Sequence, residues 1–169
     1  ADEMDERWRK ALSEPLAPVT VNQAKCQDVV YLGDELDKEG CGLDRFPVPI
    51  STPGFDNGPY TTCSHWFTRD PETGIHNIGN YRGQIKARRR IGVLPSGLGQ
   101  DIYLQWKKAQ AKGQHLPAAL VIGAPPVVSY VSVQKVAYGV DEISVAGALV
   151  DRPIPLVRCK TVDIMVPAD

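Results

Sequence analysis

The sequence has no long apolar run and no excess charge of either sign. None of its apolar stretches approaches the roughly 20 residues that a membrane-spanning helix needs. The formal net charge of the 169 residues is −1, which gives no general footprint for nucleic acid, and the one basic cluster, KARRR at residues 86–90, is interpreted as a solvated strand edge or turn. The start of the chain also lacks a signal-peptide pattern, so we expect a soluble, cytoplasmic protein.

Cysteine is scarce and scattered. Cys26, Cys41, Cys63 and Cys159 form neither a CxxC pair nor a cluster with histidine, which argues against a zinc site and a disulfide framework and predicts free thiols. Apolar residues make up 43% of the chain and charged residues 23%, as in ordinary soluble domains. The length predicts one domain with a real core, but it is short for a complete two-domain enzyme.

The most distinctive local pattern is DPETGIHNIGNYR at residues 70–82. Pro71 sets φ for the first corner of a type I turn, and Gly74 can take the left-handed conformation that closes a four- or five-residue hairpin. The pattern predicts flanking strands over residues 61–68 and 75–85.

Two side chains of the outgoing strand could grip an anion. Asn77 and Arg82 are five residues apart, so ideal strand geometry puts them on opposite faces unless Gly79 or Gly83 marks a bulge. The alternative is a solvent-facing hairpin with an incidental arginine.

The other patterns predict short strands with a few short helices at the margins. Helices are expected over residues 2–14, 100–112, 126–133 and 141–150, from apolar spacing and flanking proline and glycine. Strands are expected over residues 26–32, 46–50, 90–94, 118–122, 156–161 and 162–166. The sum is a β-rich α+β domain, consistent with an antiparallel barrel.

Four polar side chains fall at element boundaries: Asn77 and Arg82 on the hairpin strand, and Asp101 and Glu142 in the first turns of two helices. An amide oxygen and two carboxylates are ligands that Mg²⁺ or Mn²⁺ prefers, and phosphate commonly completes the shell. Arg82 could then face a carboxylate. Alternatively, the two acidic residues could complement helix dipoles, worth about 0.3 to 1 kcal/mol, and Asn77 could bond its own turn.

Five segments together carry a family resemblance. They are NIGNYR at 77–82, QDIY at 100–103, LPAALVIGAPP at 116–126, DEISVAGAL at 141–149 and PLVRCKTVDIMVPAD at 155–169. In this order, over residues 15–169, they resemble the UbiD family of reversible aromatic and α,β-unsaturated acid decarboxylases, which use prenylated FMN.

The resemblance implies a fold. It is the central split β-barrel domain of the family, similar to FMN-binding flavin reductases, with short peripheral helices. Residues 1–25 would form an N-terminal helix and connecting segment, and residues 26–169 the cofactor-binding domain.

The resemblance also implies a metal site. Asn77 and Glu142 match family ligands of a divalent ion, Mn²⁺ or Mg²⁺, that bridges to the cofactor phosphate, with K⁺ as a further candidate. Asp101 stands where many members place a histidine. It keeps an oxygen donor but adds negative charge beside a phosphate, so metal preference is open at this position.

Flavin and substrate contacts follow from the same motifs. Arg82 matches the catalytic arginine that lies by the flavin and orients the substrate carboxylate. Gln100 matches a residue that touches the cofactor. Backbone groups of Asn80 and Tyr81 would line the flavin, as would the loop at residues 95–99.

The family's catalytic acid follows the VPA segment, whereas this sequence ends at Asp169. We therefore expect the prenylated-FMN- and metal-binding middle domain of a longer carboxy-lyase, inactive by itself. Its parent would act on a small aromatic or unsaturated carboxylic acid and CO₂, and would be a homo-oligomer. The rival hypotheses are a stand-alone split-barrel flavin reductase that binds FMN and a non-catalytic assembly module.

Overall fold

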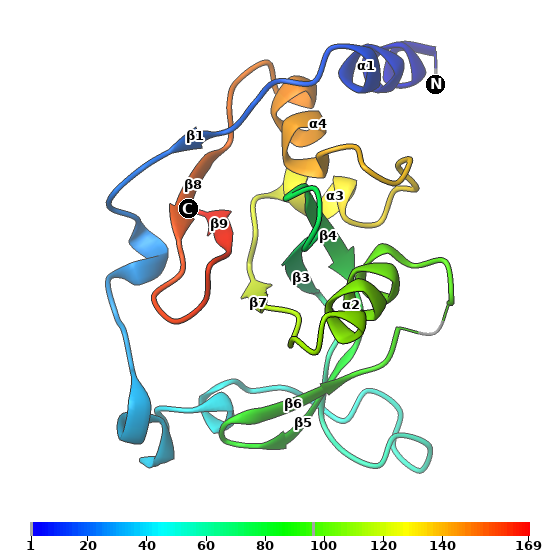
Figure 1. Cartoon of the computed structure of the whole chain (residues 1–169). Coiled ribbons are helices and arrows are strands. Elements are labelled where there is room, and N and C mark those ends of the chain that lie inside the picture. The colour runs from blue at the N-terminus through cyan, green and yellow to red at the C-terminus, as the bar shows by residue number, and fades with distance from the viewer. Residues whose placement is uncertain (1, 96) are drawn as a thin grey trace.

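The computed structural model describes residues 2–95 and 97–169, and Figure 1 shows the arrangement of their elements. Within these ranges the helices are α1 (Asp2–Ser13), α2 (Asp101–Ala111), α3 (Pro126–Val131) and α4 (Glu142–Leu149). The strands are β1 (Val19–Thr20), β2 (Tyr60–Thr61), β3 (Ser64–Arg69), β4 (His76–Asn80), β5 (Gly83–Ala87), β6 (Arg90–Val93), β7 (Ala118–Ile122), β8 (Pro155–Arg158) and β9 (Met165–Pro167). None of the described helices is long and apolar enough to cross a membrane.

The described strands form three separate three-stranded sheets. Their orders are β4-β3-β7, β2-β5-β6 and β1-β8-β9, and all pairs are antiparallel except β1 with β8. This confirms the predicted β-rich α+β class. Strand pairing in the described ranges closes no barrel, so the split barrel stays a prediction.

The main hydrophobic core lies between the β4-β3-β7 sheet and helices α3 and α4. Phe67 of β3 and Ile78 of β4 are buried there against Val128, Val131 and Val145 of the two helices. Helix α4 is apolar on nearly all sides, and all but its last two residues are buried. Packing on nearly all sides therefore fixes the position of α4. Its first residue, Glu142, is one of the predicted metal ligands.

The hairpin turn is confirmed, but its outgoing strand is not continuous. Gly74 has φ +76°, and the Asp70 amide donates to the Ile75 carbonyl at 2.9 Å. The strand predicted over residues 75–85 is wrong, because β4 ends at Asn80 and β5 begins at Gly83 in another sheet. The indole of Trp66 donates to the Tyr81 carbonyl at 3.1 Å at this crossing between sheets.

Two further predicted strands are wrong. Over residues 46–50, Pro47 and Pro49 each remove a backbone donor, and the described segment forms no ladder. Over residues 26–32, the chain instead makes a 3₁₀ turn at Lys25–Gln27 and then runs to another at Gly33–Asp37.

The strand predicted over residues 61–68 is found only in part. Thr61 pairs in the β2-β5-β6 sheet, and the longer piece, from Ser64, forms β3 in the β4-β3-β7 sheet. The remaining predicted elements are confirmed, with ends that differ by a few residues.

The predictions for the basic cluster and for the four cysteines are also confirmed. The basic cluster at residues 86–90 surrounds the exposed turn between β5 and β6. There Arg88 pairs with Asp44 at 2.9 Å and Arg89 with Asp37 at 3.1 Å. The four cysteines are free thiols.

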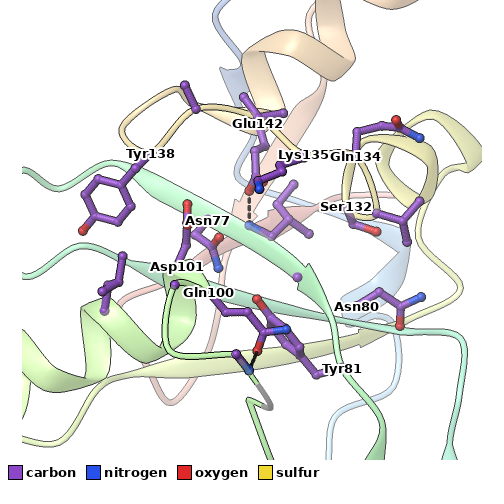
Figure 2. Close-up of a pocket in the computed structure, with 18 residues that line it drawn as sticks. Asn77, Asn80, Tyr81, Gln100, Asp101, Ser132, Gln134, Lys135, Tyr138 and Glu142 are labelled. Carbon is purple, nitrogen blue, oxygen red and sulfur yellow. Dashed lines mark hydrogen bonds between the residues drawn. The ribbon is translucent and has the colours of Figure 1, made fainter.

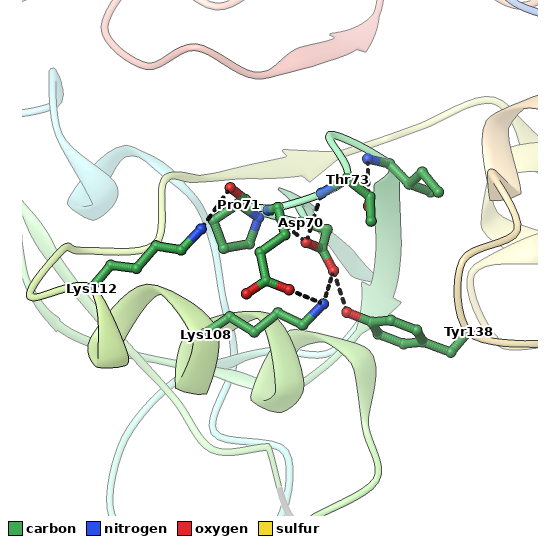
Figure 3. Close-up of polar contacts among 8 residues, drawn as sticks. Asp70, Pro71, Thr73, Lys108, Lys112 and Tyr138 are labelled. Atoms are coloured by element: carbon green, nitrogen blue, oxygen red, sulfur yellow. Dashed lines mark hydrogen bonds and ion pairs between the residues drawn. The ribbon is translucent and has the colours of Figure 1, made fainter.

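Asp70, at the corner of the hairpin turn, joins three parts of the fold (Figure 3). Its side chain accepts bonds from the backbone amides of Glu72 (2.8 Å) and Thr73 (3.1 Å), from Lys108 Nζ of α2 (2.7 Å) and from the Tyr138 hydroxyl. The residue is only 3% exposed. Burial acts to raise the pKa of Asp70, but the bonds from Lys108, Tyr138 and the backbone outweigh it and hold the pKa well below its ordinary value.

The depressed pKa predicts how Asp70 affects stability in acid. Its ionised form stabilises the fold above the unfolded pKa of about 3.9, and this contribution is lost as the pH falls toward the folded pKa. We expect Asp70→Asn to lower Tm at pH 7 by about 5 °C and to make the fall in Tm below pH 4 shallower. Thermal unfolding from pH 7 to pH 2.5 measures both effects, with Glu72→Gln as an exposed control. Identical acid profiles for wild type and Asp70→Asn would contradict this role.

Candidate functional site

A cavity of about 710 Å³ lies between β4, the start of α2 and the segment that leads into α4 (Figure 2). Its size is within the range of small-molecule and cofactor pockets. Asn77, Asp101 and Glu142, the three predicted metal ligands, all line it. They come from three elements that are distant in sequence, so the fold brings together what the sequence analysis grouped by chemistry.

Asn77 is held in a defined orientation on β4. It is 4% exposed, and its Nδ2 donates to Thr68 Oγ1 on the neighbouring strand β3 at 3.2 Å. This bond uses the amide nitrogen, so Oδ1 is available as a ligand toward the cavity. The alternative that Asn77 bonds its own turn does not hold, because its partner is on the other strand.

Glu142 is the first residue of α4 and is 7% exposed. It accepts a hydrogen bond from the Ile78 amide of β4, and Asp141, the N-cap, accepts from Ile143 N at 3.0 Å. Burial raises the pKa of Glu142 to about 8, the Ile78 bond opposes this, and the charges of Asp101 and Asp141 add to it. Glu142 is therefore a buried carboxyl, and its one hydrogen-bond donor in the described structure is a neutral backbone amide.

Asp101 is the first residue of α2, which follows Gln100 as its N-cap. Burial raises the pKa of this carboxyl as well. Within the described ranges neither Asp101 nor Glu142 forms an ion pair. Two carboxyl groups and one amide oxygen in a shared cavity fit a hard divalent cation, which would remove this electrostatic cost.

The oxygen set is a sparse one. The residues that the structure describes hold no group of three His, Cys, Asp or Glu side chains placed for a metal. The candidate site has two carboxyl groups, and the Asn77 amide oxygen is its third protein donor. The remaining ligands of a metal ion must therefore come from a bound molecule or water. An anionic phosphate would suit that place because it also balances the charge of the ion.

Tyr81, Asn80 and Gln100 line both this cavity and a second one of about 600 Å³. The Tyr81 ring lies directly over Gly79, where an added Cβ would be 2.1 Å from the ring. Burial raises the pKa of Tyr81 to about 12, with the charges of Asp101 and Glu142 adding to it. The Tyr81 side chain is thus part of the wall shared by the two cavities, where the sequence had predicted only a backbone contact.

The loop predicted to line the flavin at residues 95–99 is placed in part. Gly97 and Gly99 line the first cavity, and Gly97 N donates to Gln100 Oε1 at 3.3 Å. Ser96 lies outside the described residues.

Arg82 lies in the second cavity and not in the first. Its Nη2 donates to Asp56 Oδ1 at 2.9 Å, and its guanidinium lies 4.3 Å from the Tyr60 ring centroid. The side chain is 51% exposed. The structure therefore brings Asn77, Asp101 and Glu142 together and places Arg82 next to them, beyond the wall that Tyr81 helps to form.

The sequence analysis missed the segment at residues 132–140, which we call the wall segment. Among the described residues that line the first cavity, Lys135 is the one with a cationic side chain, and it lies on this segment. Ser132 begins the segment and Tyr138 lies near its end. The position of the segment directly before the DEIS motif is the signal that could have found it.

Ser132 is held by an unusual buried histidine. Its Oγ lies 3.0 Å from His65 Nδ1 and donates to the Ser129 carbonyl at 2.8 Å, while Ser129 Oγ lies 2.9 Å from His65 Nε2. Since the single Ser132 hydroxyl proton is already used, His65 Nδ1 must donate to Ser132. Burial lowers the pKa of His65, which favours this neutral form.

The sequence is similar to known proteins along most of its length. A family profile described as the UbiD 3-octaprenyl-4-hydroxybenzoate carboxy-lyase Rift-related domain matches residues 18–169. A phenolic acid decarboxylase of Escherichia coli O157:H7 is 31% identical over 171 residues, which cover 98% of this chain and 34% of that protein. An uncharacterised protein of Aquifex aeolicus is 34% identical over 152 residues, with 90% and 30% covered.

Solved structures show the same likeness. The UbiD-class enzyme HmfF from Pelotomaculum thermopropionicum, in complex with prenylated FMN, has a TM-score of 0.82 at 32% identity, with 99% of this chain and 38% of that chain covered. The closed form of Sedimentibacter hydroxybenzoicus vanillic acid decarboxylase has a TM-score of 0.85 at 32% identity, with 99% and 35% covered. The chain thus spans about a third of the length of these relatives, and it belongs to the UbiD family.

Proposed function

We propose that this chain is the cofactor- and metal-binding domain of a UbiD-type carboxy-lyase. The observation that carries the proposal is the set of three oxygen donors around one cavity: the buried Glu142 and Asn77 and the half-buried Asp101. Within the described residues neither carboxyl group forms an ion pair. A divalent ion, Mn²⁺ or Mg²⁺, bound there would hold the phosphate of prenylated FMN or FMN. The HmfF structures, which contain these two flavins, support the assignment by similarity.

Other residues around the two cavities would bind the cofactor and the substrate. Lys135 would balance phosphate charge from the wall segment, and Gln100 would contact the flavin where the two cavities meet. Arg82, whose guanidinium lies over the Tyr60 ring, would orient the carboxylate of the substrate from the second cavity. Prenylated flavin, when bound, supplies the electron sink for loss of CO₂.

The rest of the proposal concerns the longer protein. We propose that residues 26–169 are its middle domain, in which the three sheets correspond to a split barrel, and that residues 1–25 connect to it. The substrate would be a small aromatic or unsaturated carboxylic acid, as the name of the Escherichia coli phenolic acid decarboxylase suggests. The parent would be a homo-oligomer, and this chain alone would be inactive or nearly so, because Asp56 is the one acid that pairs with Arg82 among the described residues.

Binding of FMN and riboflavin, each with and without Mn²⁺, tests the proposal. If the ion bridges the protein to phosphate, Mn²⁺ will tighten FMN binding by at least about 10-fold and leave riboflavin binding unchanged, because riboflavin lacks the phosphate. Quenching of flavin fluorescence in a titration with the chain measures both affinities. Equal Mn²⁺ dependence for the two ligands, or no FMN binding, would contradict the proposal.

A further inference from the structure

The wall segment makes few hydrogen bonds to other elements of the described fold. At its start, His65 holds Ser132, and the amides of Val133 and Gln134 donate to the last turn of α3. Among residues 135–139 the described structure has one hydrogen bond to another element, which runs from the Tyr138 hydroxyl to Asp70. The part of the segment that carries Lys135 therefore depends on a single polar anchor.

The partner of Tyr138 is itself firmly placed. Asp70 is buried, and it is fixed by two backbone amides of the hairpin turn and by Lys108 of α2 (Figure 3). Lys108 Nζ also lies 5.1 Å from the centroid of the Tyr138 ring. The Tyr138 hydroxyl therefore bonds to a carboxylate that is itself held in place, and the Lys108 cation lies next to both groups.

The backbone next to Tyr138 forms a turn and not part of a helix or strand. Gly139 has φ +90°, a conformation that residues with a Cβ rarely adopt, and the Val140 amide donates to the Ala137 carbonyl at 3.1 Å. Tyr138 is 44% exposed, so burial alone does not hold it in place. Its polar contacts in the described structure are the hydroxyl bond to Asp70 and the Lys108 ammonium near its ring.

We propose that Tyr138 is a positioning residue, which uses its hydroxyl bond to Asp70 to hold the wall segment, and with it Lys135, in place for the cofactor phosphate. The inference rests on the proposed function. Without the anchor, the segment must be ordered when the ligand binds, and this ordering reduces affinity.

Three variants test the role of Tyr138, each examined by FMN binding with MnCl₂ and by hydrogen exchange of residues 133–140 without ligand. Tyr138→Phe and Asp70→Asn are expected to weaken FMN binding by about 10-fold or more, the effect of one lost hydrogen bond to a charged group, and to speed exchange in this stretch. Glu72→Gln is the control, because the Glu72 side chain is 49% exposed and pairs with Lys108 at 3.0 Å, and among the described residues the Tyr138 hydroxyl bonds to Asp70 and not to Glu72. It is expected to change neither measurement.

The outcomes separate this inference from the proposed function. Unchanged FMN affinity in Tyr138→Phe overturns the inference, whether or not exchange is faster. Weaker FMN binding with unchanged exchange also overturns it, because Tyr138 would then act by direct contact. If the wild-type chain binds no FMN, the proposed function fails, and the exchange arm alone decides whether Tyr138 anchors the segment.

Discussion

Replacing Glu142 by glutamine is expected to abolish the Mn²⁺ dependence of FMN binding while leaving the fold as stable as before or more so. Glutamine keeps an oxygen that accepts from the Ile78 amide and has nearly the same volume, but it removes a charge that is costly to bury. Loss of a metal ligand should weaken Mn²⁺-supported FMN binding by at least about 100-fold, more than loss of a residue that only orients a ligand.

The two readouts move in opposite directions, which distinguishes a binding defect from misfolding. Flavin fluorescence titration measures the affinity, and thermal unfolding without metal measures the stability. Glu72→Gln removes an equal charge at an exposed site and is expected to affect neither. Retained Mn²⁺ dependence in Glu142→Gln would remove Glu142 from the metal site, and a large fall in Tm would assign it a structural role instead.

Replacing Gly147 by alanine is expected to destabilise the fold by about 2 kcal/mol, a fall in Tm of roughly 4 to 8 °C. An added Cβ would lie 2.9 Å from the Leu16 carbonyl oxygen and 3.2 Å from that of Arg152. Both are backbone atoms of chain segments that pack against α4. They cannot move away by a change of rotamer, as a side chain could. This overpacking outweighs the gain of up to about 1 kcal/mol that alanine brings to a helix.

Gly99→Ala is the matched control for this substitution. An added Cβ at Gly99 would meet no atom within 4 Å, and its backbone does not have a positive φ. Its effect is expected to stay within about 0.5 kcal/mol. Equal stability of Gly147→Ala and wild type would show that the chain around α4 can relax, contrary to the close packing described above.

Features decided by a few neighbouring residues could be predicted from the sequence. The hairpin turn follows from Pro71 and Gly74, which set two backbone angles on their own. The helix that begins at Glu142 follows from its acidic start and apolar run. The three oxygen donors could be grouped from the sequence because their residue types share one chemistry, and the structure places all three around one cavity. Their role as metal ligands stays a prediction.

Features decided by distant partners could not be predicted. The crossing from β4 to β5 depends on the bond from Trp66 to Tyr81, which lies 15 residues along the chain. The anchor of the wall segment joins Asp70 to Tyr138, 68 residues away. The segment at residues 26–32 has a strand-like composition but no partner strand in the described fold, and composition alone does not reveal a missing partner.

The separation of Asn77 from Arg82 illustrates the same limit. Their five-residue spacing predicted opposite faces of one strand, whereas the chain separates them by passing from one sheet to another. As predicted, the two side chains point to different places, because they line adjacent cavities. The reason is the change of sheet between β4 and β5, which the local sequence pattern does not reveal.

Whether a metal ion joins Asn77 and Glu142 to the flavin phosphate can be seen in a crystal of this chain grown with FMN and MnCl₂, with anomalous scattering recorded at the manganese edge. We expect one strong anomalous peak in the cavity between β4 and α4, coordinated by Asn77, Glu142 and a phosphate oxygen of FMN, with Asp101 beside it. Bound FMN with no manganese at these residues, or manganese bound elsewhere on the chain, would contradict this expectation.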